Sequence, residues 1–356
     1  MAHLLIVYNG VDSITYESFG RLAVDYGWKV SVAVPDDCQA SVPPVIGRHS
    51  MKPIRSKFTL SAIGSLRRLL KELRPDVVFA ASTSGLSTAI FAAIGMPRIG
   101  IVGYRGTQAR VHAFDPTYRM ALLNPRVDHI VCETSDILEY LKAYIPDSKL
   151  SQCLKPYELA WAESAMANPV SPKNAEVINL VYVGMSAGRP YKGLRYLIDA
   201  VGLLNDRGVG VALRVIGSAD QCDIDAATAN VEFVGVSNEA LRYIAGADVY
   251  VLPSERDASP RVLREAQACG LPCVVSDIPG ARDLIVPSGE KSTGILVEPR
   301  NPEAIAVAIE TLAANPEMMK RMASNARQHI SENFRLDGYV AYFDSILKSV
   351  IEQRNG

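Results

Sequence analysis

Short apolar runs rich in β-branched residues recur along this chain, and stretches with helical spacing lie between them. A run of this kind is typical of a strand buried on both faces, and strands that alternate with helices predict a parallel sheet covered on both sides. In the first half, the predicted strands are HLLIVYNG, KVSVAVP, PDVVFAAS, RIGIVGY and DHIVCET. This alternation assigns the chain to the α/β class.

The alternation fails around ESAMANPVSPKNAEVIN and then starts again. The later predicted strands are NLVYVGM, VALRVIG, VEFVGV, DVYVLPS and CVVSD. A length of 356 residues also suits two domains better than one. We expect two similar α/β domains at 1–165 and 166–335 with a cleft between them, and a final helix at 336–356 that packs back on the first domain.

Composition predicts an ordinary soluble protein, with 48% hydrophobic residues, 21% charged residues and a net charge of −1. No apolar run reaches the roughly 18 to 20 residues of a membrane span. The start MAHLLIVYNG has no positive region before its apolar run, so it predicts a strand and not a signal peptide. Of the cysteines only Cys269 and Cys273 are close in sequence, and their spacing does not match a zinc site. We therefore expect a cytoplasmic protein with reduced thiols.

Basic residues are concentrated between Arg48 and Arg74, where eight of them accompany one acid, Glu72. Part of this segment, FTLSAIGSLRRLLKELR, has a helical apolar stripe at Leu60, Ile63, Leu66, Leu70 and Leu73. The basic face opposite the stripe is either a solvated surface or a patch attracted to anionic membrane. Nucleic acid is the weakest alternative, because no aromatic residues are interleaved with the charges.

Two acids, Asp257 and Glu265, lie in the stretch SERDASPRVLREAQACGLP, which follows a predicted strand. Ser259 can cap a helix there and Pro260 suits its first position, which brings a helix N-terminus to the carboxyl edge of the sheet. That edge is where ligands bind in open α/β sheets, and a helix N-terminus attracts phosphate. The alternative is that Glu265 forms a surface ion pair with Arg261, four residues away.

Several separated stretches of the second half together resemble the nucleotide-sugar-dependent glycosyltransferases of family 4. The resemblance runs in order from Leu180 to Glu310 through VGMSAGRPYKG, FVGVSNEAL, ADVYVLPS, DASPRVLREAQACGLPCVVSDIPGARDLI and GILVEPRNPEAIAVAI. The first half resembles the family more loosely, through YRGT and LNPRVDHIVCETS. The resemblance to this family implies two Rossmann-like domains of the GT-B type. It also implies transfer of the sugar with retention of the anomeric configuration.

The resemblance also implies roles for residues of the donor site. Glu265 matches the glutamate that holds the ribose of the nucleotide, and Asp257 stands where the family usually has a longer glutamate beside the transferred sugar. Arg189 and Lys192 match the basic pair that neutralises the diphosphate, which fixed cations stabilise as the bond breaks. The further donor-binding residues implied are Ser259, Arg261, Val262, Gly184 and Val236. Glu255 is a nearby acid, but its spacing from Glu265 fits less well.

On the acceptor side, the resemblance implies the loop with Asn9 and Gly10, and Arg105 at a sheet edge where many relatives carry histidine. His112 ranks below Arg105. The CDID stretch, with Asp223 and Asp225, imitates a metal-binding acid pair of another glycosyltransferase fold, but we expect it to be a solvated loop. No metal or other cofactor is expected.

The sequence therefore predicts a hexosyltransferase-like enzyme that moves a sugar from a nucleoside diphosphate to a hydroxyl of a glycan or glycolipid. Its predicted setting is bacterial cell-surface polysaccharide or lipopolysaccharide synthesis at the inner face of the membrane. Two alternatives remain open: a nucleotide-sugar epimerase of the same fold, and a catalytically silent sugar-nucleotide-binding protein. The base, sugar and acceptor are not identified.

Overall fold

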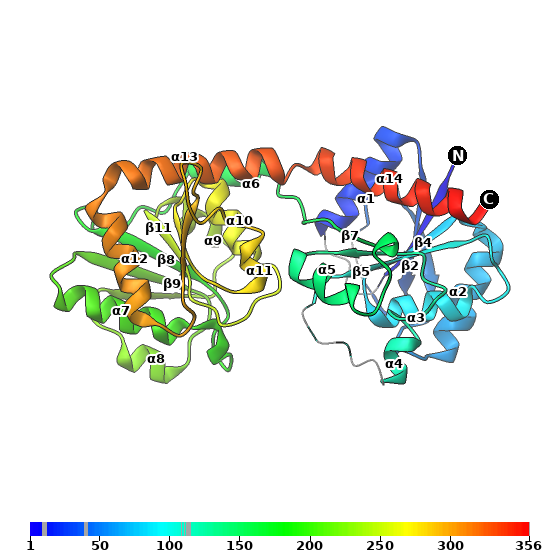
Figure 1. Cartoon of the computed structure of the whole chain (residues 1–356), viewed down its shortest axis with the longest axis horizontal. Helices are drawn as coiled ribbons and strands as arrows, with labels where there is room; N and C mark the ends of the chain where they lie inside the picture. Colours follow the sequence, from blue (N-terminus) through cyan, green and yellow to red (C-terminus); the bar gives the residue numbers. More distant parts are fainter. Residues whose placement is uncertain (9–12, 39–41, 108, 110, 112–114, 356) are drawn as a thin grey trace. The chain divides into compact units, whose positions relative to one another are not determined.

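The computed structural model describes the chain except residues 9–12, 39–41, 108, 110, 112–114 and 356. The chain folds into two compact α/β units (Figure 1). The first unit comprises Met1–Pro156 and Leu336–Gly356, and the second comprises Tyr157–Arg335. The division before Tyr157 comes earlier than the expected one at 165/166, because helix α6 (Leu159–Ala167) packs on helices of the second unit.

The first unit contains a seven-stranded parallel sheet in the order β3-β2-β1-β4-β5-β6-β7. Its strands are β1 (His3–Val7), β2 (Lys29–Pro35), β3 (Gly47–Met51), β4 (Val77–Ala80), β5 (Gly100–Arg105), β6 (His129–Cys132) and β7 (Leu150–Gln152). Its helices are α1 (Ser13–Tyr26), α2 (Leu60–Leu73), α3 (Thr83–Ala92), α4 (Pro116–Arg119), α5 (Ser135–Lys142), η1 (Asp147–Lys149) and α14 (Leu336–Asn355). Sequence patterning missed β3 and β7, because these edge strands are short and largely polar.

Helix α14 supplies part of the core of the first unit, although it is the last element of the chain. Phe343 is 1% exposed and meets Phe19 and Phe79 edge to face, with ring centroids 5.3 and 5.7 Å away. The indole Nε1 of Trp28 donates a hydrogen bond to Asp344 Oδ1 at 2.8 Å. These contacts join residues more than 260 positions apart in sequence, so they close the core only after the whole chain has been made.

Helix α2 confirms the predicted amphipathic helix, with one correction to its stripe. Leu66 and Leu70 are buried, but Leu60 at the first position is 71% exposed. The basic residues also differ from one another. Arg67 donates to the carbonyls of Ala92 and Ile94, whereas Arg68 and Lys71 are exposed.

The second unit contains a six-stranded parallel sheet in the order β10-β9-β8-β11-β12-β13. Its strands are β8 (Ile178–Val183), β9 (Val211–Ile216), β10 (Val231–Gly235), β11 (Val249–Leu252), β12 (Cys273–Ser276) and β13 (Gly294–Val297). Its other helices are η2 (Pro190–Lys192), α7 (Leu194–Asp206), α8 (Gln221–Ala226), α9 (Ala240–Ala245), α10 (Arg261–Ala268), α11 (Pro279–Arg282), α12 (Pro302–Ala314) and α13 (Pro316–Asn333). Helices α7 and α12 cover one face of this sheet, and α9 and α10 lie on the other (Figure 1).

The strand order of the second sheet places its topological switch point between β8 and β11. The chain runs outward from β8 to β10 on one side and then from β11 to β13 on the other. Beyond the loops that leave β8 and β11, α7 and α10 lie on opposite faces of the sheet, and the carboxyl edge at such a switch point is the usual ligand site of an open α/β sheet. The stretches that contain Lys192 and Asp257 both leave the sheet at this point.

Candidate functional site

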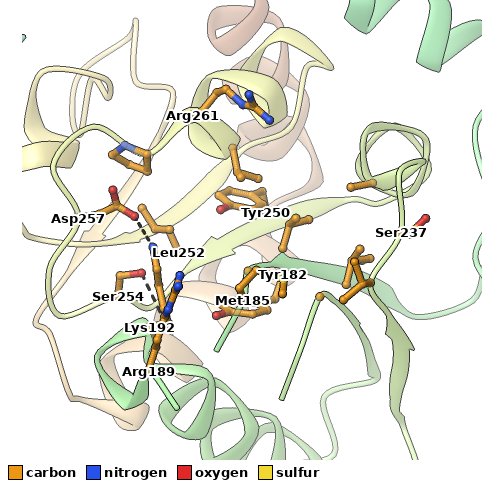
Figure 2. Close-up of a pocket in the computed structure, with 18 residues that line it drawn as sticks. Tyr182, Met185, Arg189, Lys192, Ser237, Tyr250, Leu252, Ser254, Asp257 and Arg261 are labelled. Atoms are coloured by element: carbon orange, nitrogen blue, oxygen red, sulfur yellow. Dashed lines mark hydrogen bonds and ion pairs between the residues drawn. The ribbon is translucent and has the colours of Figure 1, made fainter. Parts of the chain in front are cut away.

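A pocket of about 340 Å³ lies at this switch point (Figure 2). It is formed by the carboxyl ends of β8, β9 and β11, the loops after β8, β10 and β11, and the start of α10. The lining residues are Tyr182, Val183, Gly184, Met185, Arg189, Lys192, Ile216, Gly217, Val236, Ser237, Ala240, Tyr250, Leu252, Ser254, Asp257, Pro260, Arg261 and Val262. Most of the expected donor-site residues therefore share one pocket, whereas Ser259 and Glu265 do not line it.

The loop after β8 and the loop after β11 are joined by their backbones. The amide of Glu255 donates to the carbonyl of Tyr191 at 2.8 Å. Gly193 has a φ of 73°, and a Cβ there would lie 2.0 Å from the carbonyl oxygen of Pro253. Only glycine permits both the left-handed conformation and this close approach. The junction brings Lys192 against Asp257.

Lys192 and Asp257 form an ion pair at the pocket wall, drawn as a dashed line in Figure 2. The distance from Lys192 Nζ to Asp257 Oδ2 is 2.7 Å, and the two side chains are 23% and 19% exposed. Arg189 lies beside them on the same wall and is exposed to solvent. This part of the wall thus carries two cations and one carboxylate, an arrangement suited to an anionic ligand that also has hydroxyl groups.

Helix α10 begins at Arg261, so Pro260 occupies the N-cap position that the sequence suggested for Ser259. The expected cap is wrong because the Ser259 hydroxyl makes no hydrogen bond to the first turn. This hydroxyl is buried and has no partner among the described residues. The first-turn N–H groups of α10, at Arg261 and Val262, have no acceptor within the helix, and both residues line the pocket. They give the pocket wall a positive potential.

Glu265 lies one turn after Arg261 on α10, and its Oε1 is 3.0 Å from Nε of Arg261. The Glu265 side chain is 16% exposed and that of Arg261 is 76% exposed. Burial raises the pKa of Glu265, and the cationic Arg261 and Arg264 partly oppose that rise. The ion pair that the sequence allowed as an alternative is therefore present.

The second acid of the loop, Glu255, has other partners and does not line the pocket. It accepts a hydrogen bond from the Tyr196 hydroxyl at 3.1 Å and pairs with Arg300 at 2.6 Å. The hydrogen bond from Arg300 lowers the pKa of Glu255. Arg300 itself has a φ of 61°, which is unusual for a residue other than glycine, and the ion pair holds its side chain. Glu255 thus anchors the loop, whereas Asp257 faces the pocket.

Two features of the pocket were missed at the level of sequence. Tyr182 and Tyr250 both line it, and burial raises the pKa of Tyr182 to about 12. The Tyr250 residue is fully buried, and its hydroxyl has no hydrogen-bond partner within the described ranges. Gly280 is the other missed feature, since a Cβ there would lie 2.0 Å from the carbonyl oxygen of Asp257. The tyrosines sit within apolar strand patterns, so local sequence did not distinguish them from core residues.

On the acceptor side, Asn9 and Gly10 lie outside the described residues, as does His112. Arg105 ends β5, is 7% exposed and donates a hydrogen bond to the carbonyl of Ala109. Glu133, to which the family resemblance assigns no role, directly follows β6 and is 6% exposed. Since β5 and β6 are neighbours, these two charged residues lie at the same edge of the first sheet.

Asp223 and Asp225 lie in the short helix α8, so the expectation of a loop there is wrong. Burial raises the pKa of Asp223, and Asp225 accepts a hydrogen bond from Gln221 at 2.8 Å. Within the described part of the chain, no three His, Cys, Asp or Glu residues gather in a group that could hold a metal ion. None of the helices described there is both long enough and apolar enough to cross a membrane.

Comparisons with known proteins agree with this organisation. The model of the family described as Glycosyltransferase Family 4 matches residues 8–151. The model described as Glycosyl transferases group 1 matches residues 169–329. Each match falls within one of the two units, and the second includes the whole pocket.

The individual relatives that match this chain include further glycosyltransferases. An uncharacterized glycosyltransferase of Haemophilus influenzae is 26% identical over 64% of this chain and 72% of its own length. The capsular polysaccharide biosynthesis glycosyltransferase CapM of Staphylococcus aureus is 27% identical over 53% of this chain and 52% of its own length. The crystal structure of Anabaena HepE in complex with UDP matches with a TM-score of 0.74 and 17% identity, and covers 98% of this chain and 100% of that one.

The structural likeness confirms the predicted fold class, two Rossmann-like α/β domains of the GT-B type. The family models and the relatives confirm the resemblance on which the sequence prediction rested. The chain belongs to glycosyltransferase family 4 and is a glycosyltransferase of the group 1 type.

Proposed function

We propose that this glycosyltransferase transfers a sugar, with retention, from a nucleoside diphosphate to a hydroxyl of a glycan or glycolipid. The observation that carries the proposal is the pocket at the switch point, which combines Arg189, Lys192, Asp257 and the N-terminus of α10. Two cations and free N–H groups suit a diphosphate, and a carboxylate suits sugar hydroxyls. The complex of HepE with UDP and the role of CapM in capsular polysaccharide synthesis add support.

In the proposed reaction, the bond between the anomeric carbon and the diphosphate oxygen breaks, and a bond to the acceptor oxygen forms. Negative charge grows on the departing diphosphate, so Arg189 and Lys192 would stabilise the transition state more than the ground state. No side-chain base is assigned, and the departing phosphate oxygen would take the acceptor proton. Glu265 would exchange its contact with Arg261 for the two ribose hydroxyls, since a carboxylate accepts two such bonds.

The acceptor would be a glycan or glycolipid of bacterial cell-surface polysaccharide or lipopolysaccharide synthesis, met at the cytoplasmic side of an anionic membrane. The exposed basic residues Arg55, Arg68 and Lys71 support contact with such a membrane. Phe58 and Leu60 lie beside them in sequence and are 48% and 71% exposed. Basic side chains with nearby exposed apolar groups are the combination that favours an anionic lipid surface.

We also propose that no metal ion is required, because cationic side chains and a helix N-terminus face the diphosphate position. Turnover of the donor should therefore survive an excess of EDTA. Complete loss that Mg²⁺ or Mn²⁺ restores would contradict this proposal and direct attention to Asp223 and Asp225.

A screen of UDP, GDP and ADP by thermal shift tests the donor class, since a ligand that binds only the folded state raises the apparent melting temperature. The sugar nucleotides of the base that binds are then incubated with the protein. Slow release of nucleoside diphosphate supports a transferase. A new isomer of the intact donor would instead identify an epimerase, and binding without turnover would identify a silent binding protein.

A further inference from the structure

We propose that the ion pair between Lys192 and Asp257 is a latch that weakens binding of the product nucleoside diphosphate relative to the intact donor. The inference rests on the proposed function and adds a specificity device to it. In the pocket Lys192 is bound to Asp257, so its ammonium is not free for phosphate (Figure 2). The sugar part of the donor, which the product lacks, offers Asp257 a replacement partner.

The backbone on both sides of the ion pair is constrained, which keeps Lys192 close to Asp257. Gly193 follows it in a left-handed conformation against Pro253, and the Ser254 hydroxyl lies 3.5 Å from the Lys192 carbonyl oxygen. On the other side, the carbonyl of Asp257 packs against Gly280 with no room for a Cβ. Both backbones are therefore held in place, and the pair can open only by rotation of the two side chains.

Because the ion pair is partly buried, it affects the affinity of the pocket for phosphate. Both side chains are less than a quarter exposed, so solvent screens them less than it screens a surface pair. A phosphate that approaches Lys192 must either separate it from Asp257 or bind beside a carboxylate of the same sign. Either route lowers the affinity for a free diphosphate.

The intact donor offsets this penalty, whereas the product does not. A hydroxyl of the bound sugar can donate to Asp257 while Lys192 turns to the diphosphate, so both charged groups stay paired. After transfer the sugar has left, and Asp257 again competes with the diphosphate for Lys192. The latch thus favours the donor over the product and hastens release of the product.

The direction in which a single substitution changes nucleotide affinity tests the latch. Asp257→Asn keeps the shape of the side chain and removes its charge, so it should bind UDP, GDP or ADP, whichever the native chain binds, roughly three- to tenfold more tightly by calorimetry. A role for Asp257 toward the sugar alone predicts no change, and a structural role predicts a loss. Either result would overturn the inference. Asp277→Asn, in an acid that pairs with Arg282 outside the pocket lining, is the matched control for the change in charge and should alter affinity less than twofold.

A double-mutant cycle shows whether the effect passes through Lys192. Lys192→Ala should weaken the same nucleoside diphosphate more in the Asp257→Asn background than in the native chain, because only there is the ammonium free for phosphate. An equal loss in both backgrounds contradicts the latch. If the native chain binds none of the three nucleotides, the proposed function fails; if it binds but Asp257→Asn binds no more tightly, only the latch fails.

Discussion

At the scale of single residues, the two acids of the loop after β11 differ through their partners. Asp257 faces the pocket and pairs with Lys192, whereas Glu255 is held by Tyr196 and Arg300. Their separation by one residue places them on different sides of an irregular loop. The same type of charge therefore serves ligand binding in one case and loop anchoring in the other.

The anchoring role of Glu255 predicts a change in the pH dependence of stability. Arg300 lowers its pKa from an ordinary value of 4.5, so its stabilising contribution is present above about pH 4.5 and is lost as the pH falls through the lower, folded-state pKa. Glu255→Gln should lower the melting temperature at pH 7 and reduce the drop in melting temperature on acidification below pH 4.5. A variant with the same acid sensitivity as the native chain would contradict this account.

Glu265 provides the second prediction at this scale. If it exchanges Arg261 for the ribose, Glu265→Ala should weaken a nucleoside diphosphate and its sugar nucleotide alike, by roughly ten- to a hundredfold, since a hydrogen bond to a charged group contributes about 1.5–3 kcal/mol. Calorimetry with both ligands measures this. The control is Glu303→Ala on α12, which removes an exposed carboxylate that pairs with Arg207. Unchanged affinity in Glu265→Ala would leave this residue as the partner of Arg261 only.

At the scale of elements, α2 separates into a face that packs and a face that is exposed. Arg67 is already bound to two carbonyls near the end of α3, and Lys57 donates to the Thr117 hydroxyl, so neither is fully available to a membrane. Arg68 and Lys71 remain exposed on the helix, and Arg55 is exposed shortly before it. These three residues form the surface to test.

Reversing the charge of Arg55, Arg68 and Lys71 together should weaken binding to vesicles that contain anionic phosphatidylglycerol. Each exposed basic residue near such a surface contributes on the order of 1 kcal/mol, and the effect should diminish at high salt. Co-sedimentation measures it, with neutral phosphatidylcholine vesicles as the control. If the native chain does not sediment with anionic vesicles at low salt, the basic face is only solvated.

At the scale of the whole molecule, the chain leaves the first unit before Tyr157 and returns to it at Leu336. The first unit thus depends on residues made last. Phe343→Ala removes a ring that is 1% exposed from this core and should destabilise the first unit by about 3–5 kcal/mol.

Calorimetric scans of Phe343→Ala with and without a bound nucleoside diphosphate should show which unit has lost stability. The ligand should raise the melting transition of the second unit and leave the lowered transition of the first unit in place. Ser345→Ala, at an exposed position of the same helix, should change neither transition. A loss in the second unit instead would mean that α14 does not close the core of the first.

The pattern of amino acids is enough to predict the α/β class, most strands and helices, and the presence of two units. Buried parallel strands need continuous apolar runs and their helices need an apolar stripe, so local patterning carries this information. Short edge strands such as β3 lack such runs, which is why patterning missed them. Motif resemblance also pointed to Arg189, Lys192 and Asp257, residues that share one pocket in the structure.

Which charged side chains meet depends on how the loops are arranged in three dimensions. Lys192 and Asp257 are 65 residues apart, and their contact depends on the crossing of two loops at Gly193 and Pro253. The partner of Glu255, Arg300, comes from the turn after a third strand. Spacing in sequence specifies side chains on one helix or strand, but it does not specify contacts between loops that leave different strands. For that reason the latch could be inferred only once the fold had brought these loops together.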